Sequence, residues 1–160
     1  KIIFFSKHYV VGKNCNLEVK IVKIENLYRF EVSIPIIDFK SGIEGRDDSV
    51  RDIFKYDEYP KIEFVSKWYS YDDINNFLNI GKGEIKGLLY FSGKKLPILL
   101  SFSTKNFKNN LLIEGNFETD YNFFGISPPS FGILGEVLNF LEISFILQST
   151  KIKNFDNYFK

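Results

Sequence analysis

The stretch GEIKGLLYFSGKKLPILLSFS, residues Gly83–Ser103, decides the fold because it contains two alternating runs around a tight turn. Side chains of a strand point alternately to its two faces, so an apolar residue at every second position gives one apolar face. The short turn around Gly93 predicts antiparallel strands, because parallel neighbours need a long crossover. The predicted apolar faces consist of Ile85, Gly87, Leu89 and Phe91, followed by Leu96, Ile98, Leu100 and Phe102.

The same period of two continues through most of the chain. Further strands are expected at residues 2–5 and 17–22, and further tight turns at 25–27 and 108–110. The other apolar faces are Tyr28, Phe30, Val32 and Ile34; Ile62 and Phe64; Leu111, Ile113, Gly115 and Phe117; and Leu141, Ile143, Phe145 and Leu147. About eight antiparallel strands, each with one apolar face, must form a sandwich or close into a barrel. An inward glycine, as at Gly87 and Gly115, relieves crowding where a barrel strand bends or another group approaches closely.

The composition limits the classes of function. Lys and Arg number 21 against 20 Asp and Glu, so the chain has no general electrostatic reason to bind nucleic acid or an anionic membrane. The 18 phenylalanines are unusual, and aromatic residues make up 18% of the 160 residues. Aromatic side chains carry large apolar areas, and this chain has more of them than a small closed core needs.

The chain contains one cysteine, Cys15, and therefore forms no intrachain disulfide. It contains no Met and starts with KIIFF, so an N-terminal piece such as a signal peptide is expected to be missing. A sequence that starts within a longer protein would explain the absence of Met equally well. No apolar run reaches the roughly 18–20 residues that span a bilayer.

Two long connections interrupt the strands. In GRDDSVRDIFKYDEYPKIEF, residues 45–64, Val50, Ile53 and Phe54 stand at i, i+3 and i+4, which predicts a short helix with one apolar face. We interpret this segment as a plug on one barrel end that can also serve as a ligand clamp. In residues 123–137, a turn of helix and an extended gate both remain open.

The first connection and its flanks resemble the YceI-like family of lipid-binding periplasmic barrels, which are often called polyisoprenoid-binding. The matching residues are Arg46-Asp47, Arg51, Phe54, Tyr59-Pro60 and Phe64, with Gly93 and Pro97 in the hairpin and Phe124-Gly125-Ile126 near the end. The resemblance covers nearly the whole chain. Ser49, Ser92 and Tyr121 differ from the residues that the family often has, so polar contacts of the family are not carried over to them.

The resemblance implies an all-β, antiparallel, eight-stranded lipocalin-like barrel that forms one domain over residues 1–160, with short helical segments in the two long connections. It implies non-catalytic binding, sequestration or transport of a long-chain amphiphilic lipid, such as an isoprenoid quinone, a polyprenyl derivative or a fatty-acid derivative. The alternative is a filled barrel that acts as a structural or protein-interaction module. The side chains expected to contact lipid are Phe30, Val32, Ile34, Phe64, Leu89, Phe91, Ile98, Leu100, Phe102, Phe117, Ile143 and Phe145.

Arg46 and Arg51 are the expected polar residues of this site. With Asp47 they form either an ion pair that pins the short helix across the barrel end or an anchor for a phosphate or carbonyl head group. A guanidinium suits phosphate oxygens, and both roles can hold for different arginines.

No metal site and no catalytic site are expected. His8 and Cys15 make only two candidate ligands, and nothing near His8 indicates a nucleophile. The acidic residues of the first connection are typical of a solvated helix. No cofactor is expected apart from a bound isoprenoid or fatty-acyl lipid.

The expected partners are this lipid, a membrane surface contacted transiently, and a second copy of the chain in a homodimer; nucleic acid is not expected. Lys94 and Lys95 are candidates for the membrane contact, and Pro128-Pro129 for a gate. The resemblance implies a periplasmic location.

Overall fold

The computed structural model describes residues 2–5, 12–125 and 141–159, and over these residues it contains one sheet of eleven strands. They are β1 (Ile2–Phe5), β2 (Gly12–Asn14), β3 (Glu18–Ile24), β4 (Leu27–Pro35), β5 (Lys61–Ser66), β6 (Tyr69–Ser70), β7 (Lys82–Phe91), β8 (Lys94–Phe107), β9 (Asn110–Thr119), β10 (Leu141–Gln148) and β11 (Ile152–Lys153). The helices are α1 (Glu44–Ile53), α2 (Tyr71–Ile80) and α3 (Phe155–Phe159), with 3-10 turns η1 (Ile36–Asp38), η2 (Tyr121–Phe124) and η4 (Ser149–Lys151).

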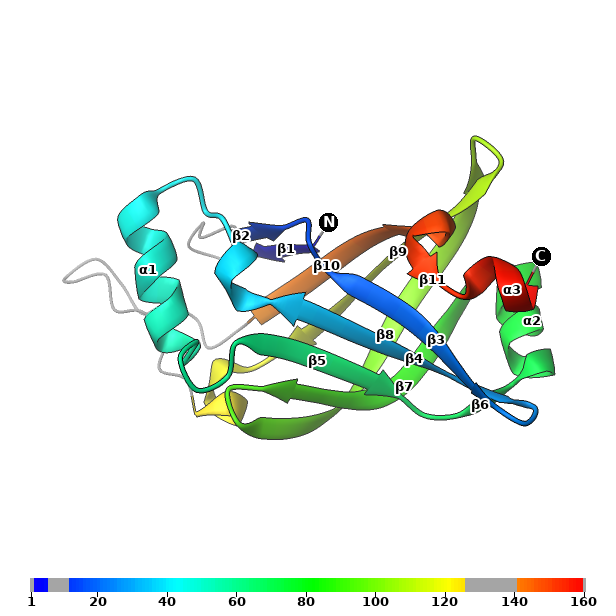
Figure 1. Ribbon diagram of the computed structural model, residues 1–160, viewed down its shortest axis with the longest axis horizontal. Helices are drawn as coiled ribbons and strands as arrows, with labels where there is room; N and C mark the ends of the chain where they lie inside the picture. Colours follow the sequence, from blue (N-terminus) through cyan, green and yellow to red (C-terminus); the bar gives the residue numbers. More distant parts are fainter. Residues whose placement is uncertain (1, 6–11, 126–140, 160) are drawn as a thin grey trace.

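The sheet curls into a nearly closed barrel (Figure 1). Its strand order is β11-β3-β4-β5-β7-β8-β9-β10-β1-β2, and β6 lies beside β4. The predicted lipocalin-like all-β barrel is therefore confirmed. Two details differ: the short strands β2, β6 and β11 were not predicted, and β11 runs parallel to β3 in an otherwise antiparallel sheet.

Two-residue turns connect three pairs of neighbouring strands, as predicted. The turn between β7 and β8 has positive φ at Ser92 (48°) and Gly93 (74°), and the turn between β8 and β9 has it at Lys108 (48°) and Asn109 (64°). Such turns match the right-handed twist of the strands that they join. They fix the register, so the apolar faces of adjacent strands coincide.

The register places the predicted apolar residues in rows that cross the sheet. Val32 pairs with Phe64, Phe64 with Leu89, and Leu89 with Leu96, which gives one apolar row over β4, β5, β7 and β8. A one-residue slip would turn each of these side chains to the outer face. The period of two in the sequence thus has its physical cause in the buried interior.

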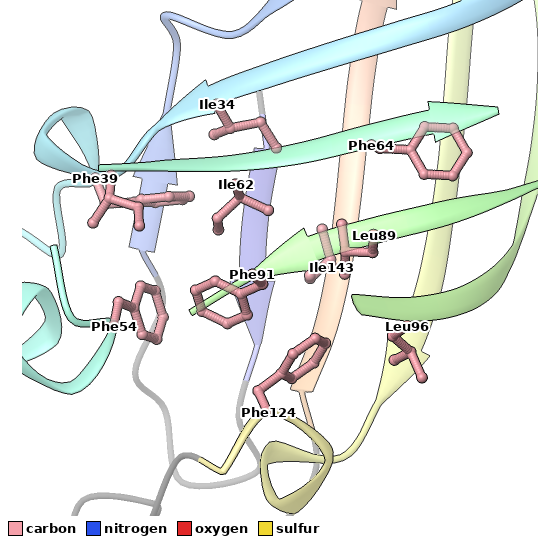
Figure 2. Packing of buried hydrophobic residues seen from close by; sticks show 11 residues of the cluster. Ile34, Phe39, Phe54, Ile62, Phe64, Leu89, Phe91, Leu96, Phe124 and Ile143 are labelled. Atoms are coloured by element: carbon pink, nitrogen blue, oxygen red, sulfur yellow. The ribbon is translucent and has the colours of Figure 1, made fainter. Parts of the chain in front are cut away.

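Helices cover the two ends of the barrel. In Figure 1, α1 lies at the left end, and α2 and α3 lie together at the right end. The buried cluster at the α1 end includes Ile34, Ile62, Phe54 and Phe91 (Figure 2). A second cluster lies toward α2 and α3 and includes Val19, Ile21, Tyr28, Ile74 and Phe155.

Hydrogen bonds join β2, at one end of the strand order, to the end of β4 and the segment that follows it. Lys13 of β2 exchanges two backbone hydrogen bonds of 2.9 Å with Lys40. The fully buried Asn14 donates from Nδ2 to the carbonyl of Pro35 at 2.7 Å. On the other side, β11 joins β3, and Asn154 Nδ2 donates to the Ile21 carbonyl at 3.2 Å.

The helix α2 was not predicted, although its sequence carries helix signals. Ser70 and Asp73 form a capping box at its start, and Gly81 ends it with a φ of 77°. Its apolar residues Ile74, Phe77 and Leu78 follow the spacing i, i+3 and i+4.

The C-terminal tail forms α3 and buries Phe155. The 3-10 turn η2 ends within the second long connection, at Phe123 and Phe124. Residues 126–140, including Pro128 and Pro129, lie outside the described residues.

Candidate functional site: an apolar cavity inside the barrel

A cavity of about 120 Å³ lies inside the barrel. All of the predicted lipid-contacting side chains except Phe91 line it, namely Phe30, Val32, Ile34, Phe64, Leu89, Ile98, Leu100, Phe102, Phe117, Ile143 and Phe145. Because they come from six strands, the cavity is a property of the closed sheet. Thr104 also lines the cavity, and the surface that the whole lining presents to the cavity is apolar.

The strand pattern missed the part of the lining that comes from helices. Ile74, Phe77 and Leu78 enter from α2, and Phe155 enters from α3. The remaining lining residues are Leu17, Val19, Ile62, Ile85, Thr104, Ile113, Leu147 and Ile152. Ile62, Ile85, Ile113 and Leu147 belong to the predicted inward faces, whereas α2 could have been found from its capping box.

Phe91 faces the buried interior as predicted, but it does not line the cavity. It lies at the end of β7, where its ring packs edge-on against Phe54 at 4.7 Å and against Phe124 at 5.0 Å between centroids. The ring centroid of Phe39 lies 6.4 Å from that of Phe54. Figure 2 shows Phe54, Phe91 and Phe124 facing one another. We call these four side chains the aromatic plug.

Glycine and phenylalanine alternate along one row of the cavity wall. Gly83 pairs with Phe102, Phe102 with Gly115, and Gly115 with Phe145. A Cβ on Gly115 would lie 2.4 Å from the Phe145 ring, and one on Gly87 would lie 2.4 Å from the Phe64 ring. The close approach predicted for Gly87 and Gly115 is thus made by aromatic rings, which lie against the wall and leave space in the lumen.

The helix predicted in the first connection is confirmed as α1, and so is its apolar face. Phe54 is buried, and Val50 and Ile53 pack against the same cluster. The segment therefore forms the predicted plug over one barrel end. Its contacts are apolar, which agrees with the structural interpretation of this stretch.

The predicted ion pair with Asp47 is wrong. Arg51 pairs with Asp48 at 2.6 Å within α1, and Asp47 instead accepts hydrogen bonds from the backbone and hydroxyl of Ser41. The Ser41 hydroxyl is the main cause that lowers the pKa of Asp47 below its usual value. Arg46 takes part in no ion pair within the described part of the chain.

Neither arginine lines the cavity. Arg46 and Arg51 lie on α1, whereas the cavity wall on β7 ends at Leu89, two residues before Phe91 of the aromatic plug. Arg51 borders a shallow surface pocket with Asp48, Tyr56 and Glu58. The structure therefore separates the predicted polar anchor from the predicted apolar site.

Candidate metal ligands are scattered. Within residues 2–5, 12–125 and 141–159, no group of three or more His, Cys, Asp or Glu side chains is placed to hold a metal ion. Cys15 is exposed, and His8 lies outside the described residues.

Among the described helices, none combines the length and the apolar composition that a bilayer crossing requires.

Solved structures share this architecture. BcnA of Burkholderia cenocepacia superposes with a TM-score of 0.74 at 17% identity, over 92% of this chain and 94% of that chain. The YCEI protein of Campylobacter jejuni gives 0.66 at 17% identity, over 88% and 84%. A polyisoprenoid binding domain from Saccharophagus degradans, implicated in plant cell wall breakdown, gives 0.68 at 10% identity, over 92% and 90%.

At such low identities the superpositions show a common fold alone. The family is shown by the sequence itself. No curated protein matches the chain in sequence. The family profile described as YceI-like domain, however, matches residues 2–153, which is nearly the whole chain. Together with the barrel and its apolar interior, this match shows that the chain belongs to the YceI-like family.

Proposed function

We propose that this protein binds the apolar chain of an amphiphilic lipid inside its barrel and catalyses no reaction. The observation that carries the proposal is the cavity inside the barrel, whose surface is apolar. Transfer of a methylene group from water to such a site is worth roughly 0.8 kcal/mol. A hydrocarbon chain can therefore bind without a strong polar contact.

Membership of the YceI-like family supports the proposal, and so does the fold shared with a domain described as polyisoprenoid binding. Isoprenoid quinones, polyprenyl derivatives and fatty-acid derivatives all present an apolar chain of the required kind. A periplasmic location, where such a protein would carry or sequester lipid, is part of the same proposal. Contact with a membrane surface and pairing into a homodimer stay predictions.

One observation favours the alternative of a filled barrel. The cavity of about 120 Å³ is smaller than the roughly 300–1,000 Å³ of sites that enclose drug-sized ligands. It is close to the ~150 Å³ of an apolar cavity that holds benzene. A chain longer than one isoprene unit must therefore move lining side chains apart.

Native mass spectrometry of the freshly purified protein distinguishes the two candidates. A mass adduct that organic solvent releases, identified as a prenyl or acyl chain, would support lipid binding. A bare polypeptide mass that does not change after incubation with ubiquinone or palmitate would support the filled barrel. The same spectra report whether the chain forms a dimer.

A further inference from the structure

We infer that the aromatic plug acts as a ruler, which ends the lumen and limits the length of chain that the barrel can bury. This inference rests on the proposed function and adds a specificity determinant to it. The plug consists of Phe39, Phe54, Phe91 and Phe124 as defined above. Phe91 and Phe124 are 2% and 0% exposed, so their rings are packed on all sides.

The register of β7 and β8 shows where the lumen stops. Leu89 lines the cavity and pairs with Leu96. Leu96 does not line the cavity, but Ile98, two residues further along β8, does line it. The next inward residue of β7 is Phe91, which is packed between Phe54 and Phe124. On β7 and β8 the lining thus ends at Leu89 and Ile98, whereas on β4 and β5 the paired Ile34 and Ile62 continue it up to the plug.

The opposite limit lies beneath α2. On β8 the lining runs from Ile98 to Thr104, next to the C-terminal end of α2, where the Thr104 amide donates to the Gly81 carbonyl at 2.7 Å. Six residues of strand span roughly 20 Å, which the usual strand tilt reduces to about 15 Å along a barrel axis. Once the lining side chains have moved apart, a channel of this length holds about a dozen methylene groups in extended form.

The same geometry orients the ligand. The plug offers ring faces and edges, so a head group placed against it would exchange its hydration for an apolar surface. The other end of the lining, at Thr104, lies next to α2 and away from the plug. The chain therefore enters with its apolar tip toward the plug, and its polar end stays near α2 and α3 rather than near Arg46 and Arg51.

A homologous series of acylcarnitines with saturated chains of four to eighteen carbons tests the ruler by isothermal titration calorimetry. We expect the dissociation constant to fall roughly fourfold with each added methylene, as the transfer free energy requires, and to level off at about twelve carbons. Affinity that keeps rising through eighteen carbons would overturn the ruler alone. If no chain length bound, lipid binding itself would fall together with this inference.

Variants identify the plug as the cause of the limit. Phe91→Leu shortens a plug side chain, so the series should level off at a longer chain, whereas Ile98→Phe narrows the lumen and should move the limit to a shorter chain. Phe107→Ala, on an exposed ring 43% accessible at the far end of β8, is the matched control and should leave the limit unchanged. A limit that stays in place in both Phe91→Leu and Ile98→Phe would overturn the inference.

The orientation has its own measurement. A nitroxide attached to the polar end of dodecanoylcarnitine should broaden the amide NMR signals of α2 and α3. Broadening of the α1 signals instead would place the head group at the arginine end and overturn the proposed direction of entry.

Discussion

The ring of Phe77, on α2, lies so close to Gly83 of β7 that a Cβ on the glycine would stand 2.7 Å from Cδ1 of the ring. The other near atoms belong to the Phe102 ring, at 3.0 Å. The missing side chain of Gly83 is therefore what allows α2 to lie against the barrel. The contact joins the helix that covers one end to the wall of the cavity.

Gly83→Ala should lower the free energy of unfolding by about 1–3 kcal/mol, because an extra methyl group in a packed site forces rings out of position. Gly45→Ala, in α1, is the matched control, since nothing lies within 4 Å of the new Cβ. Urea denaturation measures both variants. Adding Phe77→Leu should recover part of the loss, and strictly additive effects would show that the two residues are not coupled.

Leu100→Trp should fill the lumen and weaken binding of dodecanoylcarnitine roughly tenfold or more, because the larger ring takes the space of the chain. Its neighbour Leu99 points to the outer face and is 44% exposed, so Leu99→Trp adds the same ring outside the barrel. Calorimetric titration of both variants measures the difference. Equal affinity in Leu100→Trp and wild type would place the lipid elsewhere.

Ser70→Ala should destabilise the protein by about 0.5–2 kcal/mol, since the hydroxyl caps α2 by accepting from the Asp73 amide at 3.1 Å. Amides of the first turn of α2 should also exchange faster with solvent. Ser49→Ala, whose exposed hydroxyl donates to the Gly45 carbonyl within α1, serves as the control and should stay within about 0.5 kcal/mol. Unchanged exchange in Ser70→Ala would mean that packing alone holds the start of α2.

Glu31 makes part of the stability depend on pH. Lys20 bonds to its carboxylate at 2.8 Å, Arg29 also pairs with it, and the hydrogen bond from Lys20 is the main cause that lowers the pKa of Glu31. A lowered pKa in the folded state means that the stabilisation is complete above the unfolded pKa of about 4.3 and disappears as the pH falls through the folded value.

Glu31→Gln should therefore cost up to about 1 kcal/mol at pH 7, and the difference from wild type should vanish in acid. Urea denaturation at a series of pH values between neutral and acid measures it. A difference that stays constant below the pKa of Glu31 would show that the charge of its carboxylate is not involved.

The strands could be predicted because the buried interior imposes the period of two, and most of the cavity lining followed from it. Phe91 shows the limit of this pattern. Alternation tells which face of a strand points inward, but the end of the lumen depends on Phe54 and Phe124, which reach Phe91 from distant parts of the chain. That contact exists only in the folded barrel.

The helical parts were harder for two physical reasons. In α2, Asp72, Asn75 and Asn76 give a polar run that resembles a loop, although the capping box and the apolar spacing indicate a helix. In α1, Asp47 and Asp48 both stand within one turn of Arg51, where either could pair with it. Ser41, from outside the helix, binds Asp47 and leaves Asp48 for the arginine.

The parallel pairing of β11 with β3 has a consequence for the order of events during synthesis. Asn154 reaches back over 133 residues to bond the Ile21 carbonyl, and β11 supplies the partner for β3 at one edge of the sheet. Contacts so distant in sequence form late, because the loop entropy is lost before they add stability. The edge of β3 therefore stays unpaired until residues 152 and 153 have been synthesised and have left the ribosome. Until then this edge exposes the backbone groups that β11 covers in the folded barrel, where another chain could pair with them.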